Sequence, residues 1–305
     1  MQKSKVIIIG GPTASGKTVL SIELAKRING EIVSADSMQI YKEMNIGTAK
    51  PDKEEMQGIK HYMLDFLNPN QAYSVADYKK DAKKAIKEII EKGKTPIVVG
   101  GTGLYIDSLI YEIEYIDIKT DFEYRNKLEK IVEEQGLEKL YQEAKKIDPK
   151  AMEKISENDK KRILRILEIY YQTGKTKTEL DNNSRKEPEY DYKMFAIDMD
   201  RDVLYDRINK RVDIMISKGL IEEVKNIYDR YNEFPTSMQA LGYKEVVEFL
   251  ENKISKEEMT EKIKQESRRY AKRQLTWFRK NKDTIWLNGQ EDLEKNINII
   301  LEEMR

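Results

Sequence analysis

The sequence contains no cysteine and a single histidine, His61. Without cysteine the chain can form neither disulfide bonds nor a thiolate zinc site, which suits a reducing compartment. No apolar run approaches the roughly 20 residues that a membrane-spanning helix needs. An apolar strand expected from residue 6 leaves no space for a secretory signal. We therefore expect a soluble, cytoplasmic protein without a membrane partner.

The sequence also lacks net charge, because 55 Lys and Arg residues balance 55 Asp and Glu residues. A general polycation is thereby excluded, although basic residues can still gather locally. No strand–Ser–helix turn accompanies His61, so we interpret this histidine as structural, or as a minor contact near the cleft, rather than as part of a Ser-His-Asp site. The 305 residues suffice for one large domain or two modest domains with a buried core.

A glycine-rich segment at residues 10–18 follows directly after an apolar run at residues 6–9. It matches a Gly, four residues and Gly-Lys-Ser/Thr, a pattern in which backbone N–H groups and a helix N-terminus surround phosphate oxygens. Lys17 adds a mobile positive charge, and the Thr18 hydroxyl can hold Mg²⁺. We predict a loop that binds a diphosphate or triphosphate through Gly10, Gly11, Pro12, Thr13, Ala14, Ser15, Gly16, Lys17 and Thr18.

Short apolar runs alternate with helical periodicity through the first third of the chain. Ser74 and Asp77 form a capping box that opens one of the helices, and Gly93 closes it. Such alternation predicts parallel βαβ units in a three-layer α/β core. Strands are expected near residues 6–9, 31–35, 96–99, 194–198 and 284–287.

The sequence changes character between residues 119 and 188. Strand-like runs vanish, charged residues become denser, and helical spacing continues over residues 122–135, 137–146 and 161–171. We interpret this stretch as an all-helical insertion. The predicted domains are a discontinuous core, residues 1–118 with 189–305, and the insertion, residues 119–188.

Two strand ends should share a cleft with the phosphate loop, because the carboxyl ends of parallel strands line the ligand crevice. The second strand leads into Asp36, which could bind a metal, act as a general base or only cap a turn. Strand 96–99 ends in Gly-Gly-Thr-Gly, where Thr102 could contact a substrate or the glycines could only allow close helix packing. No acid or glutamine is placed to activate water, which favours group transfer over hydrolysis.

Basic residues gather in two segments, 160–165 and 268–282, and the second contains Tyr270 and Trp277. Arginine and lysine beside aromatic rings suit phosphate contacts and base stacking in nucleic acids. The alternative is a solvated helix face. Few acidic residues are interspersed, which favours contact with nucleic acid.

Several separated segments together resemble the tRNA dimethylallyltransferases (tRNA isopentenyltransferases) of bacterial type. The segments occur in the family's order and cover nearly the whole chain, with departures such as Lys161, where the family has a glutamine. The resemblance implies an α/β fold with a P-loop NTPase-like, three-layer parallel-sheet core and an all-helical insertion, and ATP binding by similarity of fold. The matching segments are residues 10–18, 36–41, 46–51, 73–75, 100–105, 158–168, 239–245 and 270–279.

The resemblance implies transfer of a dimethylallyl group from dimethylallyl diphosphate to N6 of the adenosine 3′-adjacent to the anticodon in tRNA, with release of diphosphate. Asp36 would accept the N6 proton, and Thr102 and Arg125 would orient the reacting groups. Lys17 and Mg²⁺ on Thr18 would stabilise the leaving group. The adenosine would be flipped into the cleft of a monomeric enzyme while the insertion clamps the anticodon stem-loop. Contacts with tRNA are expected from Asp36, Ser37, Met38, Gln39, Lys161, Arg162, Ile163, Leu164, Arg165, Arg273 and Arg279.

Two other functions stay open from the residues alone. A small-molecule kinase of the nucleoside or shikimate type also pairs a phosphate loop with an aspartate after the second strand, but it explains neither basic segment. An RNA-binding protein switched by ATP, without group transfer, lacks a residue that activates water.

Overall fold

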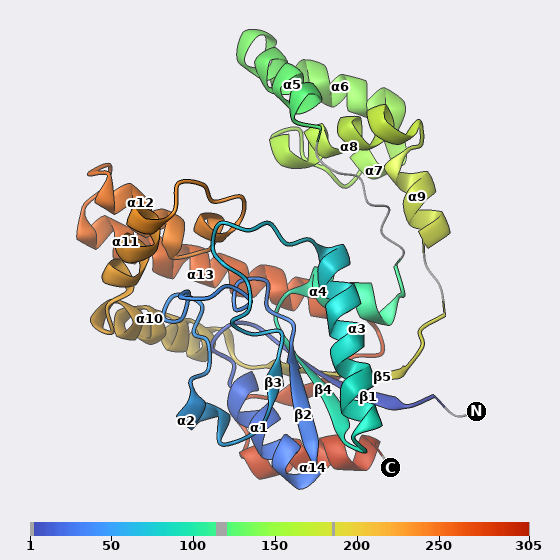
Figure 1. Cartoon of the computed structure of the whole chain (residues 1–305), viewed down its shortest axis with the longest axis vertical. Coiled ribbons are helices and arrows are strands. Elements are labelled where there is room, and N and C mark those ends of the chain that lie inside the picture. Colours follow the sequence, from blue (N-terminus) through green and yellow to red (C-terminus); the bar gives the residue numbers. More distant parts are fainter. Residues whose placement is uncertain (1–2, 114–120, 185–186, 305) are drawn as a thin grey trace. The chain divides into compact units, whose positions relative to one another are not determined.

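The computed structural model describes residues 3–113, 121–184 and 187–304. The chain forms two compact units (Figure 1): a core unit, residues 1–110 with 189–305, and an insertion unit, residues 111–188. The predicted start of the insertion, residue 119, lies outside the described residues.

The core unit is built on a six-stranded parallel sheet with the strand order β3-β2-β4-β1-β5-β6. This confirms the predicted parallel α/β core. The short edge strand β3 was missed, because two residues carry no periodic pattern. The strands are β1 (Lys5–Gly10), β2 (Gly30–Ser34), β3 (His61–Tyr62), β4 (Thr95–Gly100), β5 (Asp191–Asp198) and β6 (Ile285–Asn288).

The helices of the core unit flank this sheet. The predicted capping box at the start of α3 is present: the Ser74 hydroxyl accepts a hydrogen bond from the Asp77 backbone N–H (3.2 Å), and the Asp77 carboxylate accepts one from the Ser74 N–H (2.9 Å). The helices are α1 (Lys17–Arg27), α2 (Lys53–Met56), α3 (Val75–Glu91), α4 (Gly103–Ile110), α10 (Arg201–Ser217), α11 (Leu220–Arg230), α12 (Tyr243–Leu250), α13 (Lys256–Phe278) and α14 (Leu293–Glu303).

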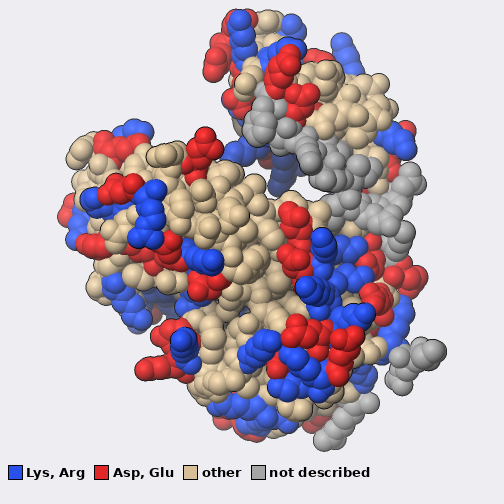
Figure 2. Space-filling view, viewed as in Figure 1, with Lys and Arg blue, Asp and Glu red and all other residues tan. Residues whose placement is uncertain are grey.

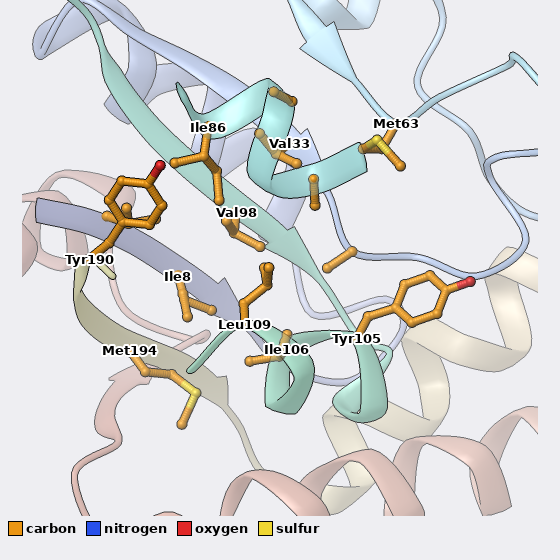
Figure 3. Close-up of a cluster of buried hydrophobic side chains, with 14 of the residues drawn as sticks. Ile8, Val33, Met63, Ile86, Val98, Tyr105, Ile106, Leu109, Tyr190 and Met194 are labelled. Carbon is orange, nitrogen blue, oxygen red and sulfur yellow. The ribbon is translucent and has the colours of Figure 1, made fainter. Parts of the chain in front are cut away.

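Helices cover both faces of the sheet. Because successive side chains of a strand point to opposite sides, the sheet contributes to a buried cluster on either face. In β1, Ile8 joins the cluster formed with α3 and α4, where it lies near Val98 and Leu109 (Figure 3). Ile7 and Ile9 join the cluster formed with α1, α10 and α14. Helices on both faces give the three layers predicted from the sequence.

A third cluster joins α10, α11, α12 and α13 to the long segment between β2 and β3. Ile40, Tyr41 and Met44 of that segment are buried against Val224 and Tyr243 of the helices. The segment after β2 is therefore fixed by helices from the far end of the sequence.

The described part of the insertion unit, residues 121–184, contains helices and no strand, which confirms the predicted all-helical insertion. Its own hydrophobic core includes Leu128, Leu140, Ile163 and Leu167. The helices are α5 (Phe122–Gln135), α6 (Leu137–Ile147), α7 (Pro149–Met152), α8 (Lys160–Thr173) and α9 (Lys177–Ser184).

Charged side chains of both signs are mixed over the face shown in Figure 2, and the middle of this face of the core unit is mostly uncharged. Neither sign of charge dominates this face. Among the described residues, no helix has the length and apolarity needed to cross a membrane.

Candidate active site

The phosphate loop, residues 10–18, connects β1 to α1 as the sequence predicts. Ala14 and Gly16 have positive φ angles of 63° and 93°, and Gly16 directly precedes the first helical residue. Gly11 has a φ of 141°, and a Cβ there would lie 3.1 Å from the carbonyl oxygen of Ile197 and from Ser15 Oγ. Only glycine fits this turn, where the loop passes directly over β5.

The positive charges of Lys17 and Arg211 converge on this loop. Lys17 Nζ donates hydrogen bonds to the carbonyl oxygens of Gly11 (3.0 Å) and Pro12 (2.6 Å). Burial, together with the charge of Arg211, lowers the pKa of Lys17 to about 7, against an opposing effect of Asp36. Two cations held close together in a desolvated place provide a site for an anion.

Two further observations at the loop favour a phosphate ligand. The Ser15 hydroxyl is buried and has no hydrogen-bond partner among the described residues. Burial also lowers the pKa of the Arg211 guanidinium. Buried polar groups are normally hydrogen-bonded, so a bound oxyanion would accept the hydrogen bond that the Ser15 hydroxyl does not make to the described residues and would offset the burial of the Arg211 charge.

The loop opens into a cavity of about 600 Å³ formed by the core unit. One face of α10 lines it with Ile208, Arg211, Val212 and Met215, which are spaced as neighbours on a helix surface. The cavity thus has a charged end, where the phosphate loop meets Arg211, and an apolar end lined by Val212 and Met215 of α10, which pack in one cluster with Ile46 and Ala240. Its lining comes from residues 13–19, 36–39, 47–49, 99–101 and 239–242, from Lys244, and from α10 and α13.

Asp36 and Thr102 lie at the carboxyl ends of β2 and β4, as predicted. Asp36 Oδ1 accepts hydrogen bonds from the backbone N–H groups of Met38 (2.9 Å) and Gln39 (3.2 Å), so the carboxylate does cap a turn. Thr102 Oγ1 accepts a hydrogen bond from the Ser37 N–H (3.1 Å). These bonds tie the two strand ends together and hold Asp36 at the cavity; its catalytic role stays a prediction.

Gln274 of α13 was missed by the sequence analysis, although it stands inside a segment singled out for its basic residues. Its Oε1 accepts a hydrogen bond from the Thr13 N–H (2.9 Å), and its Nε2 donates to the carbonyl oxygen of Gly101 (3.0 Å). A Cβ at Gly101 would lie 1.9 Å from that Nε2. Gln274 therefore joins the phosphate loop to the end of β4, and only glycine allows this approach.

The basic residues of α13 have different environments. Arg273 is exposed and lines the cavity, with its guanidinium 5.7 Å from the centre of the Tyr270 ring. Burial and the nearby charge of Asp36 raise the pKa of Tyr270. Arg279, which follows the helix, instead donates a hydrogen bond to Asp198 (2.9 Å). Of these two arginines, both predicted to contact tRNA, only Arg273 borders the cavity.

The segment after β2, which is predicted to bind tRNA, forms part of the cavity lining. Asp36, Ser37, Met38 and Gln39 all line it. Gln39 Nε2 donates hydrogen bonds to the carbonyl oxygens of Thr48 (3.1 Å) and Ala49 (3.2 Å). The Gln39 amide is therefore engaged in holding another part of the cavity lining.

The prediction of tRNA contacts by Ile163 and Leu164 was wrong. Their side chains are only 0% and 1% exposed and pack in the core of the insertion unit. Lys161 and Arg162 are exposed, and Arg165 is partly exposed. The apolar residues belong to the buried face of an amphipathic helix, and only the basic residues are available to a partner.

Arg125 lies on α5 of the insertion unit, where its Nε is 3.3 Å from Oε1 of the buried Glu168. Arg165 Nη1 is 3.4 Å from the other carboxylate oxygen of Glu168. The two arginines thus share one buried acid. The catalytic role of Arg125 stays a prediction.

His61 occupies the edge strand β3, and its Nδ1 is 2.9 Å from the carbonyl oxygen of Ile59. Burial lowers the pKa of His61. This environment agrees with a structural role.

The described residues contain no group of three or more His, Asp or Glu side chains that could hold a metal ion. Thr18 is exposed in the first turn of α1 and lines the cavity. A Mg²⁺ ion beside phosphates typically keeps several waters and takes few protein ligands. The residues present therefore fit Mg²⁺ held by the Thr18 hydroxyl, phosphate oxygens and water.

Comparison with known proteins places the chain in a family. The family model described as IPP transferase matches residues 39–281. A tRNA dimethylallyltransferase of Acetivibrio thermocellus is 53% identical over 288 residues, which cover 94% of this chain and 92% of the relative. One of Caldanaerobacter subterraneus is 51% identical over 302 residues, covering 96% of each chain.

Solved structures agree with this assignment. The full-length tRNA isopentenylpyrophosphate transferase of Bacillus halodurans aligns with a TM-score of 0.74 at 44% identity, covering 99% of this chain and 96% of that one. A eukaryotic dimethylallyltransferase acting on tRNA aligns with a TM-score of 0.81 at 32% identity, covering 98% of this chain and 77% of that one. The chain belongs to the IPP transferase family.

Proposed function

We propose that the chain transfers a dimethylallyl group from dimethylallyl diphosphate to N6 of the adenosine 3′-adjacent to the anticodon in tRNA and releases diphosphate. The observation that carries the proposal is the cavity itself, which combines a phosphate loop and Arg211 at one end with apolar side chains of α10 at the other. An allylic diphosphate has the same division into a charged and an apolar part. Relatives about half identical to this chain are named for the same reaction.

The charged end would stabilise the leaving group. As the allylic C1–O bond breaks, its electron pair moves to the diphosphate, and negative charge grows beside Lys17, Arg211 and the backbone of the phosphate loop. Mg²⁺ held by Thr18 would supply additional positive charge there. Groups that contact charge developing in the transition state lower the barrier more than they strengthen ground-state binding.

The nucleophile would be the N6 amine, whose lone pair forms the new bond to C1. Its proton would pass to the Asp36 carboxylate, which is held at the cavity by the Met38 and Gln39 N–H groups. Thr102 fixes the same turn through Ser37. This arrangement supports Asp36 as the general base and Thr102 as a residue that orients the reacting groups.

The tRNA would contact both units. Arg273 borders the cavity of the core unit, and Lys161, Arg162 and Arg165 are available on α8 of the insertion unit. Arg125 of the insertion unit would orient the reacting groups, as the resemblance to the family implies. We further propose that the chain acts as a monomer, and a tRNA substrate supports a cytoplasmic location.

The proposal is tested by transfer of label from dimethylallyl diphosphate to tRNA in the absence of ATP. We expect label in tRNA with adenosine at the 3′-adjacent position and none in a matched tRNA with guanosine there. Absence of transfer, together with ATP-dependent phosphorylation of a metabolite, would support the kinase instead. ATP-dependent tRNA binding without transfer would support the switched RNA-binding protein.

A further inference from the structure

The segment of residues 45–49 forms part of the cavity lining without belonging to any helix or strand. Gly47, Thr48 and Ala49 face the cavity. Neighbouring Met44 and Ile46 pack in the cluster of α10–α13. A segment without regular hydrogen bonding needs other partners for its backbone groups.

Glu223 of α11 supplies those partners. Its Oε2 accepts hydrogen bonds from the backbone N–H groups of Asn45 (2.9 Å) and Ile46 (2.8 Å). Its Oε1 accepts hydrogen bonds from the Gly47 N–H (3.1 Å) and from the Tyr243 hydroxyl (2.6 Å). Burial and the Glu223 charge raise the pKa of Tyr243, which keeps its hydroxyl protonated as a donor. One carboxylate thus holds three successive backbone N–H groups.

The segment also packs closely against α11 and α12. A Cβ at Gly47 would lie 2.4 Å from the ring of Tyr243 and 2.9 Å from a methyl group of Leu220. At its other end, the carbonyl oxygens of Thr48 and Ala49 are bound by the Gln39 amide. The position of this part of the lining is therefore set by Glu223 and Gln39 together.

The 45–49 segment shares the cavity with the apolar face of α10 and with residues 240–242. Residues 240–242 are held in a similar way, since the fully buried Glu245 accepts a hydrogen bond from the Gly242 N–H (2.8 Å). The width of the apolar end thus depends on two loops that buried or half-buried carboxylates fix in place. A displaced loop would change which hydrocarbon chain fits.

We propose that Glu223 is a positioning residue that sets the width of the apolar end of the cavity and thereby selects a five-carbon allylic donor over longer ones. The inference rests on the proposed function, because it presumes that this end holds the hydrocarbon part of an allylic diphosphate. Glu223 acts through the 45–49 segment and does not itself line the cavity.

The Glu223→Gln variant tests this proposal sharply, because the glutamine amide has one accepting oxygen. In one orientation of the amide, its NH₂ group faces the Asn45 and Ile46 N–H groups; in the other it faces the Gly47 N–H, while the Tyr243 hydroxyl can turn to accept. In either orientation at least one backbone N–H loses its acceptor. Hydrogen bonds to a charged acceptor are stronger than those to a neutral one, so the segment is expected to move when the carboxylate is lost.

Glu43→Gln provides a matched control. Glu43 also joins the stretch after β2 to the α11 region, through hydrogen bonds from Arg230 and from the Tyr231 hydroxyl, the latter at 3.0 Å. Unlike Glu223, it binds no backbone N–H of the 45–49 segment in the described structure. If weaker contact between the stretch after β2 and α11 were enough to reduce the preference for the five-carbon donor, both variants would show the reduction.

The measurement compares kcat/KM for dimethylallyl diphosphate with kcat/KM for geranyl diphosphate, using the full chain and tRNA. We expect Glu223→Gln to reduce the preference for the five-carbon donor about tenfold or more, and Glu43→Gln to leave it unchanged. Tyr243→Phe removes one of the four donors and should shift the ratio in the same direction by a smaller factor; it also provides the test if Glu223→Gln does not fold.

Equal changes for both donors in Glu223→Gln, or in Tyr243→Phe where that variant replaces it, would overturn the inference, as would a ratio shifted equally by Glu43→Gln. These outcomes differ from failure of the proposed function. If the unmodified protein transfers label from dimethylallyl diphosphate but the ratio stays constant, only the role of Glu223 is wrong. If the unmodified protein transfers nothing from either donor, the proposed function is wrong.

Discussion

The phosphate end of the cavity is built on one continuous loop, to which α10 adds Arg211 and α13 adds Gln274, whereas the apolar end is assembled entirely from segments far apart in the chain. Residues 10–18 carry their own turn geometry, with positive φ at Gly11, Ala14 and Gly16. At the apolar end, the bond between Asn45 and Glu223 joins residues 178 positions apart. Local sequence determines the turn geometry of the phosphate loop, and tertiary packing determines the arrangement of the apolar end.

This difference should appear in the kinetics. The charged end faces atoms whose charge changes during the reaction, so substitutions at this end are expected to lower kcat. The apolar end contacts a hydrocarbon that is held in both the ground state and the transition state. Substitutions at the apolar end are expected mainly to raise KM for the donor and to change which donor is preferred.

The largest effect is expected from Asp36→Asn. Asparagine retains an oxygen that can accept the Met38 and Gln39 N–H bonds, so the turn should persist while the basic carboxylate is lost. We expect kcat to fall about 10²- to 10⁴-fold, the range typical for general bases. Single-turnover transfer measures the rate, and tRNA binding measured by fluorescence anisotropy provides the control. Weaker tRNA binding with unchanged kcat would contradict the general-base role.

A somewhat smaller effect is expected from Lys17→Met. Removing one group that stabilises a developing anion costs about 10²- to 10³-fold in kcat. Lys26→Met, an exposed lysine on the same helix paired with Glu23, is the control and should retain full activity. If Lys17→Met raised KM for the donor and left kcat unchanged, the charged end would act by ground-state binding, and the contrast with the apolar end would disappear.

The charged end also predicts proton uptake on binding. The pKa of Lys17 is about 7 in the free protein, and a bound diphosphate should raise it by favouring the charged amine. At pH 8 binding should therefore take up nearly one proton. Calorimetry of diphosphate binding in buffers with different ionisation enthalpies measures this, and Lys17→Met should lose the uptake. Uptake that persists in that variant would assign the proton to another group.

The same pKa affects stability without ligand. A lysine with a pKa of about 7 in the folded state and 10.5 in the unfolded state binds fewer protons when folded between these pH values. The contribution of Lys17 to the free energy of unfolding is therefore unfavourable below pH 7 and vanishes as the pH approaches 10.5. Lys17→Met should be more stable than the unmodified protein at neutral pH, and the difference should shrink at higher pH in denaturant titrations.

Sequence patterns predicted what depends on neighbouring residues. The phosphate loop, the capping box of Ser74 and Asp77 and five strands were found because each has a local signature. The edge strand at His61–Tyr62 was missed, since two residues pair with β2 only through the tertiary fold. Ile163 and Leu164 were wrongly predicted to contact tRNA, because they lie between basic residues in the sequence but belong to the buried face of the helix.

The part of the site that the sequence did not predict lies on helix faces that resemble ordinary amphipathic surfaces. Arg211 stands among Ile208, Val212 and Met215, and nothing in this spacing indicates a cavity. Gln274 became recognisable only when its two hydrogen bonds to the phosphate loop and Gly101 were known. Long-range contacts of this kind leave no periodic signal in the sequence.

The smallest effect is expected at the apolar end, from Met215→Ala. Met215 lines the cavity one helical turn beyond Arg211 and is partly buried. Truncation enlarges the space for hydrocarbon without touching the phosphate loop, so KM for dimethylallyl diphosphate should rise about tenfold, the scale of a lost apolar contact, with kcat nearly constant. Ile214→Ala, an exposed neighbour on α10, is the control and should change neither. A fall in kcat with unchanged KM would show that the two ends act together on the transition state, and the division between them would fail.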